Sequence, residues 1–283
     1  MRAVRRFLAN RGAAVGAVLV VLLLLLTVMP HRDPLAPHID RGLSALGAPL
    51  PPSSQALLGT DPLGRDVWAR VCAGASVSLE LAALSTLLAL ALGLSVGLTA
   101  GYAGGWVDSA LMRLVDLVLA FPYLLLAILL AALLREANLA GGTAPVVLTI
   151  AICSWTAMAR VIRGKTLSLA RSEHVIAARA LGASPLRIVV RHVLPNVAGV
   201  VIVVTALGFA QNLLAESVLS YLGLGPPPPA PTWGRMLYEG RAYYRTAPWL
   251  AIAPGVAIVT AVVAFNLLGD ALRDLYDPKA ARR

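Results

Sequence analysis

Six stretches of this chain carry no charged residue, and each is long enough to supply most or all of a membrane-spanning segment. They cover residues 12–30, 81–107, 117–134, 137–159, 193–215 and 246–269. About 20 apolar residues in a helix cross the hydrocarbon core of a bilayer. Runs of this length in lipid must satisfy their backbone hydrogen bonds internally, which leaves helices as the state for them. The sequence therefore predicts an all-α integral membrane protein with six transmembrane helices.

The composition agrees with a membrane location. The 283 residues are 58% hydrophobic and 13% charged, whereas a soluble domain has about 25% charged residues. The two cysteines, Cys72 and Cys153, lack the paired spacing of a disulfide framework or a metal knuckle. Pro122 and Pro254 lie within apolar runs and predict kinks that neighbouring helices accommodate.

The runs divide the chain into four parts. Residues 1–30 form a basic tail and a first helix. A cleaved signal peptide is the alternative, but the long apolar run without a small-residue cleavage site favours a retained helix. Residues 31–75 form an extracytoplasmic connecting segment, with a short helix possible from Gly64 onward. Residues 76–272 form a core of five membrane helices with a cytoplasmic loop at 163–195, and residues 273–283 form a cytoplasmic tail.

The positions of the lysines and arginines predict the orientation. With the amino terminus inside, the inner segments hold sixteen of them and the outer segments eight. This bias places both termini in the cytoplasm. Topology thus explains most of the net charge of +10, and we expect no nucleic-acid partner.

A polar segment at residues 171–195 interrupts the apolar runs. Ser172 and Gly182 are start and stop signals for a first short helix. Ser184 and Pro185 begin a second helix, which Pro195 either ends or bends into the next membrane run. A short, arginine-flanked helix of small residues on the cytoplasmic side is suited to insertion into the cleft of a partner protein.

Motifs for catalysis are weak. Gly164-Lys165-Thr166 resembles the end of a phosphate-binding loop, but Ala159 stands where the first glycine belongs and an apolar run precedes it in place of a strand. The four histidines lie outside the uncharged runs, which disfavours an intramembrane hydrolase or a metal site. We therefore expect neither an enzyme nor a bound cofactor or metal.

Several polar and small residues lie within or beside the membrane runs. Gln211, Asn212 and Glu216 are expected to share one helix face, where they could line a solute pathway or join helices by hydrogen bonds. Arg113 and Asp116 are spaced to pair on one helix. The Gly93-x-x-x-Gly97-x-x-x-Gly101 spacing predicts close helix packing.

A proline-rich outer segment, residues 220–233, cannot be helical throughout. Pro227, Pro228 and Trp233 in it are candidates for contact with an extracytoplasmic protein, since a stiffened loop loses little entropy on binding. The alternative is an interfacial loop with Trp233 and Trp249 at headgroup level.

The segment at 171–195 resembles the cytoplasmic loop of ATP-binding-cassette importer permeases through Ala177-Ala178, Gly182 and Val193-Leu194-Pro195, although Ile176 stands where that family has glutamate. Further runs resemble the C-type permease subunit of dipeptide, oligopeptide and nickel importers. These runs are residues 58–66, 101–108, 112–122, 222–225 and 264–270. The resemblance extends from about Leu58 to Asp277 and implies a type I importer permease bundle with a cytoplasmic coupling helix.

The resemblance also implies partners and roles. Such a subunit forms half of a pathway with a B-type permease, and it works with two ATPase subunits, which bind ATP and Mg, and an extracytoplasmic substrate-binding protein. The implied ATPase-coupling residues are Glu173, His174, Ala177, Ala178, Arg179, Leu181, Gly182, Ala183, Ser184 and Pro185. The transported solute stays open among peptides, nickel and related solutes.

Two alternatives from another class are a secondary transporter and a membrane anchor subunit that transports nothing. A secondary transporter is expected to show inverted repeats and ionisable groups at the membrane midplane. The sequence has no obvious repeat of its halves, and its ionisable groups lie near the ends of the runs.

Overall fold

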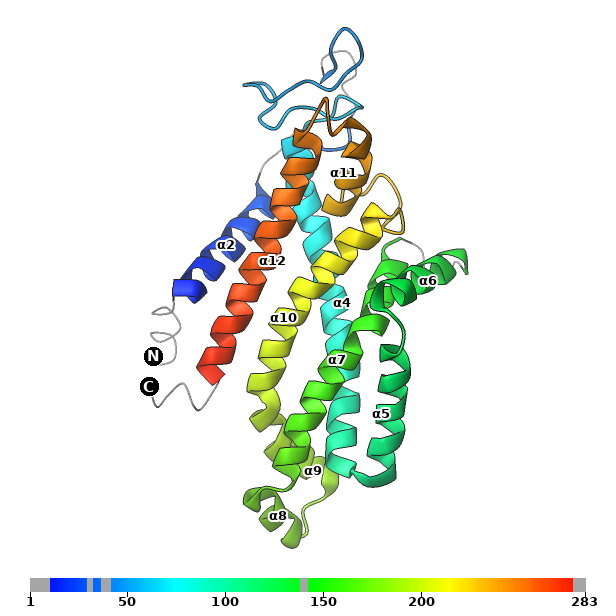
Figure 1. Ribbon diagram of the computed structural model, residues 1–283. Helices are drawn as coiled ribbons and strands as arrows, with labels where there is room; N and C mark the ends of the chain where they lie inside the picture. The colour runs from blue at the N-terminus through cyan, green and yellow to red at the C-terminus, as the bar shows by residue number, and fades with distance from the viewer. Residues whose placement is uncertain (1–10, 30–32, 37–41, 138–141, 277–283) are drawn as a thin grey trace.

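The computed structural model describes residues 11–29, 33–36, 42–137 and 142–276, and these residues fold almost entirely into helices (Figure 1). The long helices are α2 (Arg11–Val28), α4 (Val67–Ala103), α5 (Gly105–Leu119), α6 (Tyr123–Glu136), α7 (Ala144–Ala170), α10 (Leu194–Tyr221) and α12 (Trp249–Tyr276). The short ones are α8 (Glu173–Ala180), α9 (Pro185–Ile188), the π-helical turn η1 (Val189–Val193), α11 (Trp233–Gly240) and the 3₁₀ turn η2 (Arg241–Tyr243).

The third predicted membrane helix, at 117–134, is not one helix. Its residues are divided between α5 and α6, whose axes differ by 89°. Pro122 lies at the break in an extended conformation, with φ −57° and ψ 126°, and its ring disfavours the helical conformation for Phe121 before it. The described residues therefore contain five helices that can each cross a membrane, or six spans if this bent pair counts as one. The predicted kink at Pro122 is confirmed, whereas the single continuous helix is wrong.

Helix α4 begins fourteen residues before the apolar run that predicted it. The Asp66 carboxylate accepts hydrogen bonds from the backbone N–H of Trp68 (2.8 Å) and Ala69 (3.4 Å), which caps the helix. The short helix considered from Gly64 onward is the first part of α4. At 37 residues, α4 is about 55 Å long and extends beyond the hydrocarbon core of a bilayer, which is about 30 Å thick.

Helices α4 and α7 pack closely because of the predicted glycine face. A Cβ atom added to Gly97 would lie 2.8 Å from the Ala159 carbonyl oxygen and 2.9 Å from the Ile162 Cβ. Gly93 and Gly101 face α7 in the same way, against Met158 and Thr166. The glycines thus let the two backbones approach within one chain.

Pro195 does not end the helix before it. Residues Pro185–Tyr221 form one continuous helical segment, in which η1 lies between α9 and α10 and Pro195 occupies the first turn of α10, a position that proline tolerates. The predicted end of the helix at Pro195 is therefore wrong, and the helix runs on into the membrane segment, as the alternative prediction required apart from its bend.

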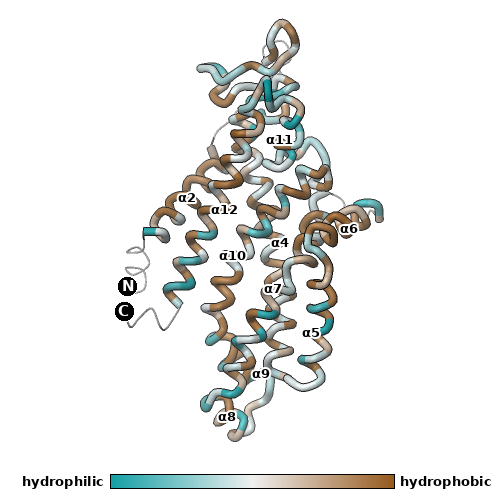
Figure 2. The backbone as a smooth tube through the Cα atoms, in the orientation of Figure 1, coloured by the Kyte–Doolittle hydropathy of each residue, from teal (hydrophilic) through white to brown (hydrophobic). Residues whose placement is uncertain are grey.

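The bundle has two polar ends. The loops before α4 and helix α11 lie at one end, and α8 lies at the other (Figure 1). Hydrophilic residues gather around α11 and α8, while hydrophobic residues dominate the helices between them (Figure 2). Helices α2 and α12 pack side by side, and the first residues of α2 and the last of α12 point toward the α8 end (Figure 1).

Candidate functional site

Helix α8 and the turn after it form a hook at one end of the bundle. Gly182 has φ +79°, a left-handed conformation that glycine adopts without a Cβ penalty. The N–H of Ala183 donates to the Ala178 carbonyl (3.1 Å), and the N–H of Gly182 donates to that of Arg179 (3.0 Å). This pair of bonds is a Schellman motif, which ends a helix sharply. The predicted stop at Gly182 is thereby confirmed.

The hook is held against the bundle by a few buried apolar side chains. Val175 on α8, Ile188 on α9 and Val193 on η1 are fully buried in one cluster with Ile162 of α7. Arg179 lies over the ring of Tyr102, with its guanidinium carbon 5.6 Å from the ring centroid. These contacts give the hook a defined position at the ends of α4, α7 and α10.

The outer surface of the hook is apolar as well as basic. Ile176, Leu181 and Leu186 are exposed by 55%, 89% and 75%. Of the ten predicted coupling residues, Ala178 and Ala183 are half-buried, and the other eight are exposed: Glu173, His174, Ala177, Arg179, Leu181, Gly182, Ser184 and Pro185. Exposed leucine and isoleucine side chains close together in the chain indicate a surface that a partner covers.

Ser172 occupies the position before α8, but it does not cap that helix with its side chain. Its hydroxyl instead donates to the Leu169 carbonyl at 2.5 Å and lies 3.4 Å from Nε2 of His174. Ser172 thereby ties the start of α8 to the end of α7. Ser184 and Pro185 stand at the start of α9 as predicted.

Two ion pairs join α5 to α7 on the side of the hook. Arg163 donates from Nε and Nη2 to the two carboxylate oxygens of Asp108, both at 2.5 Å, and Arg160 donates to Asp116 at 2.5 Å. The predicted pair of Arg113 with Asp116 is therefore wrong. Asp116 instead pairs with Arg160 of α7, the helix that packs beside α5.

The three polar residues predicted on α10 do not share one exposed face. Asn212 is buried and donates to Thr86 of α4 at 3.0 Å, so it joins two helices. Glu216 is fully buried and accepts from Ser220 at 2.6 Å. Gln211 is exposed. The prediction of a common face is therefore wrong for Gln211, which lies a third of a turn away from Asn212.

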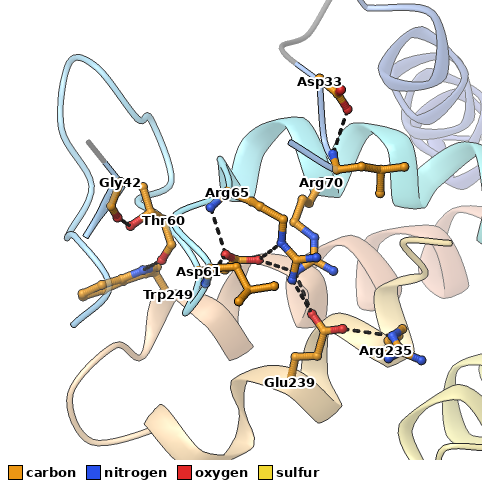
Figure 3. Close-up of polar contacts among 11 residues, drawn as sticks. Asp33, Gly42, Thr60, Asp61, Arg65, Arg70, Arg235, Glu239 and Trp249 are labelled. Carbon is orange, nitrogen blue, oxygen red and sulfur yellow. Dashed lines mark hydrogen bonds and ion pairs between the residues drawn. The ribbon is translucent and has the colours of Figure 1, made fainter. Parts of the chain in front are cut away.

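A cluster of five charged residues lies at the opposite end of the bundle (Figure 3). Arg70 on the first turn of α4 donates from Nη1 to Asp61 (2.6 Å) and to Glu239 of α11 (2.8 Å). Arg65 also binds both carboxylates, at 2.6 Å and 3.0 Å, and Arg235 binds Glu239 at 2.9 Å. The side chains of Arg70 and Asp61 are only 3% and 2% exposed. The cluster therefore joins the loop before α4, the start of α4 and α11.

The arginines outweigh burial at Glu239. Burial alone would raise the pKa of this carboxyl, but Arg70, Arg65 and Arg235 together hold its pKa below the ordinary value. Glu239 is thus ionised in the folded protein at neutral pH, as three guanidinium partners require.

The proline-rich segment after α10 is divided between exposed and buried residues. Pro227 and Pro228 are exposed. Trp233, however, is fully buried, and its indole N–H donates to the Val71 carbonyl of α4 at 3.0 Å. The prediction that Trp233 contacts a partner or lies at headgroup level is wrong, because α4 and α11 enclose the ring. Trp249 is half-buried and donates from Nε1 to the Thr60 carbonyl at 3.2 Å (Figure 3).

Sequence reasoning missed the charged cluster. Asp61 and Arg65 stand four residues apart, which is compatible with a local ion pair, but Arg70 follows five residues later and was not signalled. Glu239 stands 169 residues from Arg70, and no local pattern connects them. The motif Gly164-Lys165-Thr166 lies inside the continuous helix α7, where the backbone forms no phosphate-binding loop.

The sequence of this chain is similar to a known protein family and to named members of transport systems. Residues 93–282 match the family model described as "Binding-protein-dependent transport system inner membrane component". The chain is 42% identical over 276 residues to the glutathione transport system permease protein GsiD of Shigella flexneri serotype 5b (strain 8401). It is 40% identical to the protein of the same name from Escherichia coli O6:K15:H31 (strain 536 / UPEC). Each alignment covers 97% of this chain and 89% of the relative.

A solved structure supports the same fold. The chain superimposes with a TM-score of 0.58 on a chain from an inward-facing structure of the MetNI methionine ABC transporter, over 71% of this chain and 94% of that one. The sequence identity is 18%, so this similarity concerns the fold alone. The predicted all-α bundle of the type I importer permeases is confirmed.

Proposed function

This chain belongs to the family of binding-protein-dependent transport system inner membrane components, and from this premise we propose how it works within an ATP-driven importer. It is a permease subunit of such an importer, located in the inner membrane and without ATPase activity of its own. In our proposal it forms half of the solute pathway, and a related second permease forms the other half.

The observation that carries the proposal is the apolar outer surface of the hook. Ile176, Leu181 and Leu186 are exposed to an extent that costs free energy in water, whereas Val175 and Ile188 anchor the same segment to the bundle. A rigidly held helix with an apolar outer face suits a groove of a partner protein. We assign this groove to an ATPase subunit, and two such subunits would bind ATP and Mg and serve the two permeases.

The chain offers a direct path from the hook to the membrane. Residues Pro185–Tyr221 are continuous helix, so a displacement of the hook moves α10. Helix α7 enters the hook from the other side and is bound to α5 through Asp108–Arg163 and Asp116–Arg160. Closure of the ATPase pair on ATP would pull the hook and rock these helices as a unit between inward-open and outward-open arrangements.

This role sets the orientation in the membrane. The hook must face the cytoplasm, where ATP is present. Since the start of α2 and the end of α12 point toward the hook end (Figure 1), both termini would then be cytoplasmic. The sixteen basic residues assigned to inner segments by sequence favour the same orientation. The charged cluster and Pro227 and Pro228 would face the extracytoplasmic substrate-binding protein.

For the solute, we propose small peptides. The two relatives compared above are named as permeases of a glutathione transport system, and glutathione is itself a small peptide. Nickel and longer peptides are the other solutes that the sequence resemblance suggests.

The proposal can be tested in two steps. Affinity purification of the tagged chain, expressed with the genes that flank its own, should recover ATPase subunits and ATP hydrolysis. Uptake of labelled glutathione, dipeptides, oligopeptides and nickel in a strain lacking the chain should then identify the solute. A preparation that contains no ATPase subunit, or a hook accessible to cysteine labelling only from outside the cell, would contradict the proposal.

A further inference from the structure

The extracytoplasmic end carries an excess of positive charge on α11 and the turn after it. Residues 233–245 contain Arg235, Arg241 and Arg245 but one acidic residue, Glu239. We refer to the three arginines as the α11 ledge. Glu239 already binds Arg235, Arg70 and Arg65. Its negative charge is therefore balanced within the cluster and does not neutralise Arg241 and Arg245.

Arg241 and Arg245 are exposed. The guanidinium carbon of Arg241 lies 3.9 Å from the ring centroid of Tyr238, and that of Arg245 lies 5.5 Å from the ring centroid of Tyr244. Among the described residues, neither arginine has a carboxylate partner. Stacking on an aromatic ring orients a guanidinium while its N–H groups stay available for a carboxylate.

A cleft adjoins the ledge. It has a volume of about 470 Å³, and its walls include Pro62, Leu63, Pro228, Pro229, Tyr243 and the ledge residue Arg235. Arg235 donates from Nε to Glu239, and among the described residues its two terminal nitrogens have no hydrogen-bond partner. Because the buried pairs of Arg70 with Asp61 and Glu239 fix α11 relative to α4, the cleft and the ledge are held in place before any partner arrives.

We propose that the α11 ledge and the adjoining cleft receive acidic side chains of the extracytoplasmic substrate-binding protein. This inference rests on the proposed function and adds the chemistry of the contact. Three arginines within the short segment 233–245 complement carboxylates on the facing lobe, and long-range attraction between them speeds encounter. Exposed Pro228 in the wall of the cleft and exposed Pro227 before it supply apolar contact at little entropic cost.

The test uses the complete transporter in liposomes with its own binding protein. The readout is the concentration of binding protein that gives half-maximal stimulation of ATP hydrolysis, at low and at high salt. For the wild type, this concentration should rise with salt, because exposed charge pairs are screened. For Arg241→Glu/Arg245→Glu, the half-maximal concentration at low salt should be higher than that of the wild type on the order of tenfold. It should also lose most of its dependence on salt.

A matched variant separates charge from shape. Arg241→Lys/Arg245→Lys keeps both charges, so its half-maximal concentration of binding protein should stay close to that of the wild type. If the two side chains acted only by packing, this agreement would not be expected. An unchanged half-maximal concentration in the charge-reversal variant at both salt concentrations would overturn the proposal. So would a charge-reversal variant that loses only bound anionic lipid, since the ledge would then contact the membrane.

The experiment distinguishes failure of the acidic contact from failure of the proposed function. If the wild-type complex transports solute and responds to the binding protein, but charge reversal changes neither, then only the acidic contact is wrong. If no binding protein stimulates the wild-type complex, the proposed function itself fails.

Discussion

Arg70 and Glu239 form an ion pair of 2.8 Å across 169 residues of sequence. Arg70 lies on the first turn of α4, and Glu239 lies on α11 between the last two membrane helices. The same arginine nitrogen binds Asp61 at 2.6 Å. One guanidinium therefore connects three segments at the end of the bundle opposite the hook, and its side chain is almost fully shielded from water.

Removal of Arg70 should strongly destabilise the folded subunit. Arg70→Met leaves Asp61 buried with one guanidinium in place of two, and breaking a buried pair costs about 3 kcal/mol or more. The thermal unfolding midpoint of the purified subunit in detergent measures this loss. Arg235→Met is the matched control, because this side chain is 27% exposed against 3% for Arg70, so its loss should cost less. Equal midpoints for the two variants would contradict the prediction.

The cluster should also make stability depend on pH on the acid side. The pKa of Glu239 is lower in the folded protein than its ordinary value, because the arginines around it outweigh burial. This carboxyl therefore binds a proton more readily in the unfolded chain, where its pKa is about 4.3. The stabilisation is complete above that pH and is lost as the pH falls toward the lower, folded-state pKa.

The comparison that isolates this group is wild type against Glu239→Gln. The difference between their unfolding midpoints should be constant from about pH 6 to pH 7 and should shrink below about pH 4.3. A difference that instead grows as the pH falls would show that Glu239 is not stabilised in its ionised form.

Gly97→Ala should impair the packing of α4 on α7. The added Cβ would lie 2.8 Å from a backbone oxygen and 2.9 Å from the Ile162 side chain, and overpacking of this kind costs about 1–3 kcal/mol. Gly255→Ala adds the same methyl group to α12 where no atom lies within 4 Å. The yield of monodisperse protein and its unfolding midpoint should fall for the first variant only. A comparable loss in both would point to a general intolerance of added volume.

Local sequence signals predicted the parts of the fold that depend on local physics. The apolar run at 12–30 corresponds to α2, and the glycine spacing from Gly93 to Gly101 corresponds to the contact with α7. Gly182 ends α8 because a left-handed residue is needed there. For α2 and Gly182 the cause lies within a few residues of the signal, whereas the glycine spacing predicted close packing of α4 without identifying α7 as its neighbour.

Long-range partners account for what sequence did not predict. Trp233 follows a run of prolines and looked like an exposed aromatic residue, but α4 supplies a carbonyl and a cover for it. Asp116 pairs with Arg160 in place of Arg113 because α7 packs beside α5. The start of α4 was missed by fourteen residues, since hydropathy marks the membrane and not the cap at Asp66.

Gly182→Leu should uncouple solute uptake from ATP hydrolysis while the chain still inserts into the membrane. A branched side chain at φ +79° costs about 1–2 kcal/mol, so the Schellman turn shifts and α8 is presented differently. The ratio of solute transported to ATP hydrolysed, in liposomes, should fall. Gly47→Leu introduces similar backbone strain at φ +71°, in a turn at the opposite end of the bundle with open space around it, and the ratio for this variant should equal that of the wild type. Normal uptake by Gly182→Leu at normal expression would count against the role of the turn.

Leu181→Asp should weaken the attachment of the ATPase subunits without unfolding the permease. Leu181 is 89% exposed, so the substitution removes no contact within the chain, yet burial of a leucine in a partner's groove is worth about 1.5–3 kcal/mol, or roughly tenfold to a hundredfold in affinity. Leu46→Asp is the matched control, because Leu46 is 96% exposed at the opposite end of the bundle. The measurement is the amount of ATPase subunit retained on the tagged permease at increasing dilution, with the unfolding midpoint of each permease as a check on folding. Full retention on Leu181→Asp would mean that the apolar surface of the hook is covered by something other than the ATPase, whereas selective loss on that variant identifies the hook as the docking element.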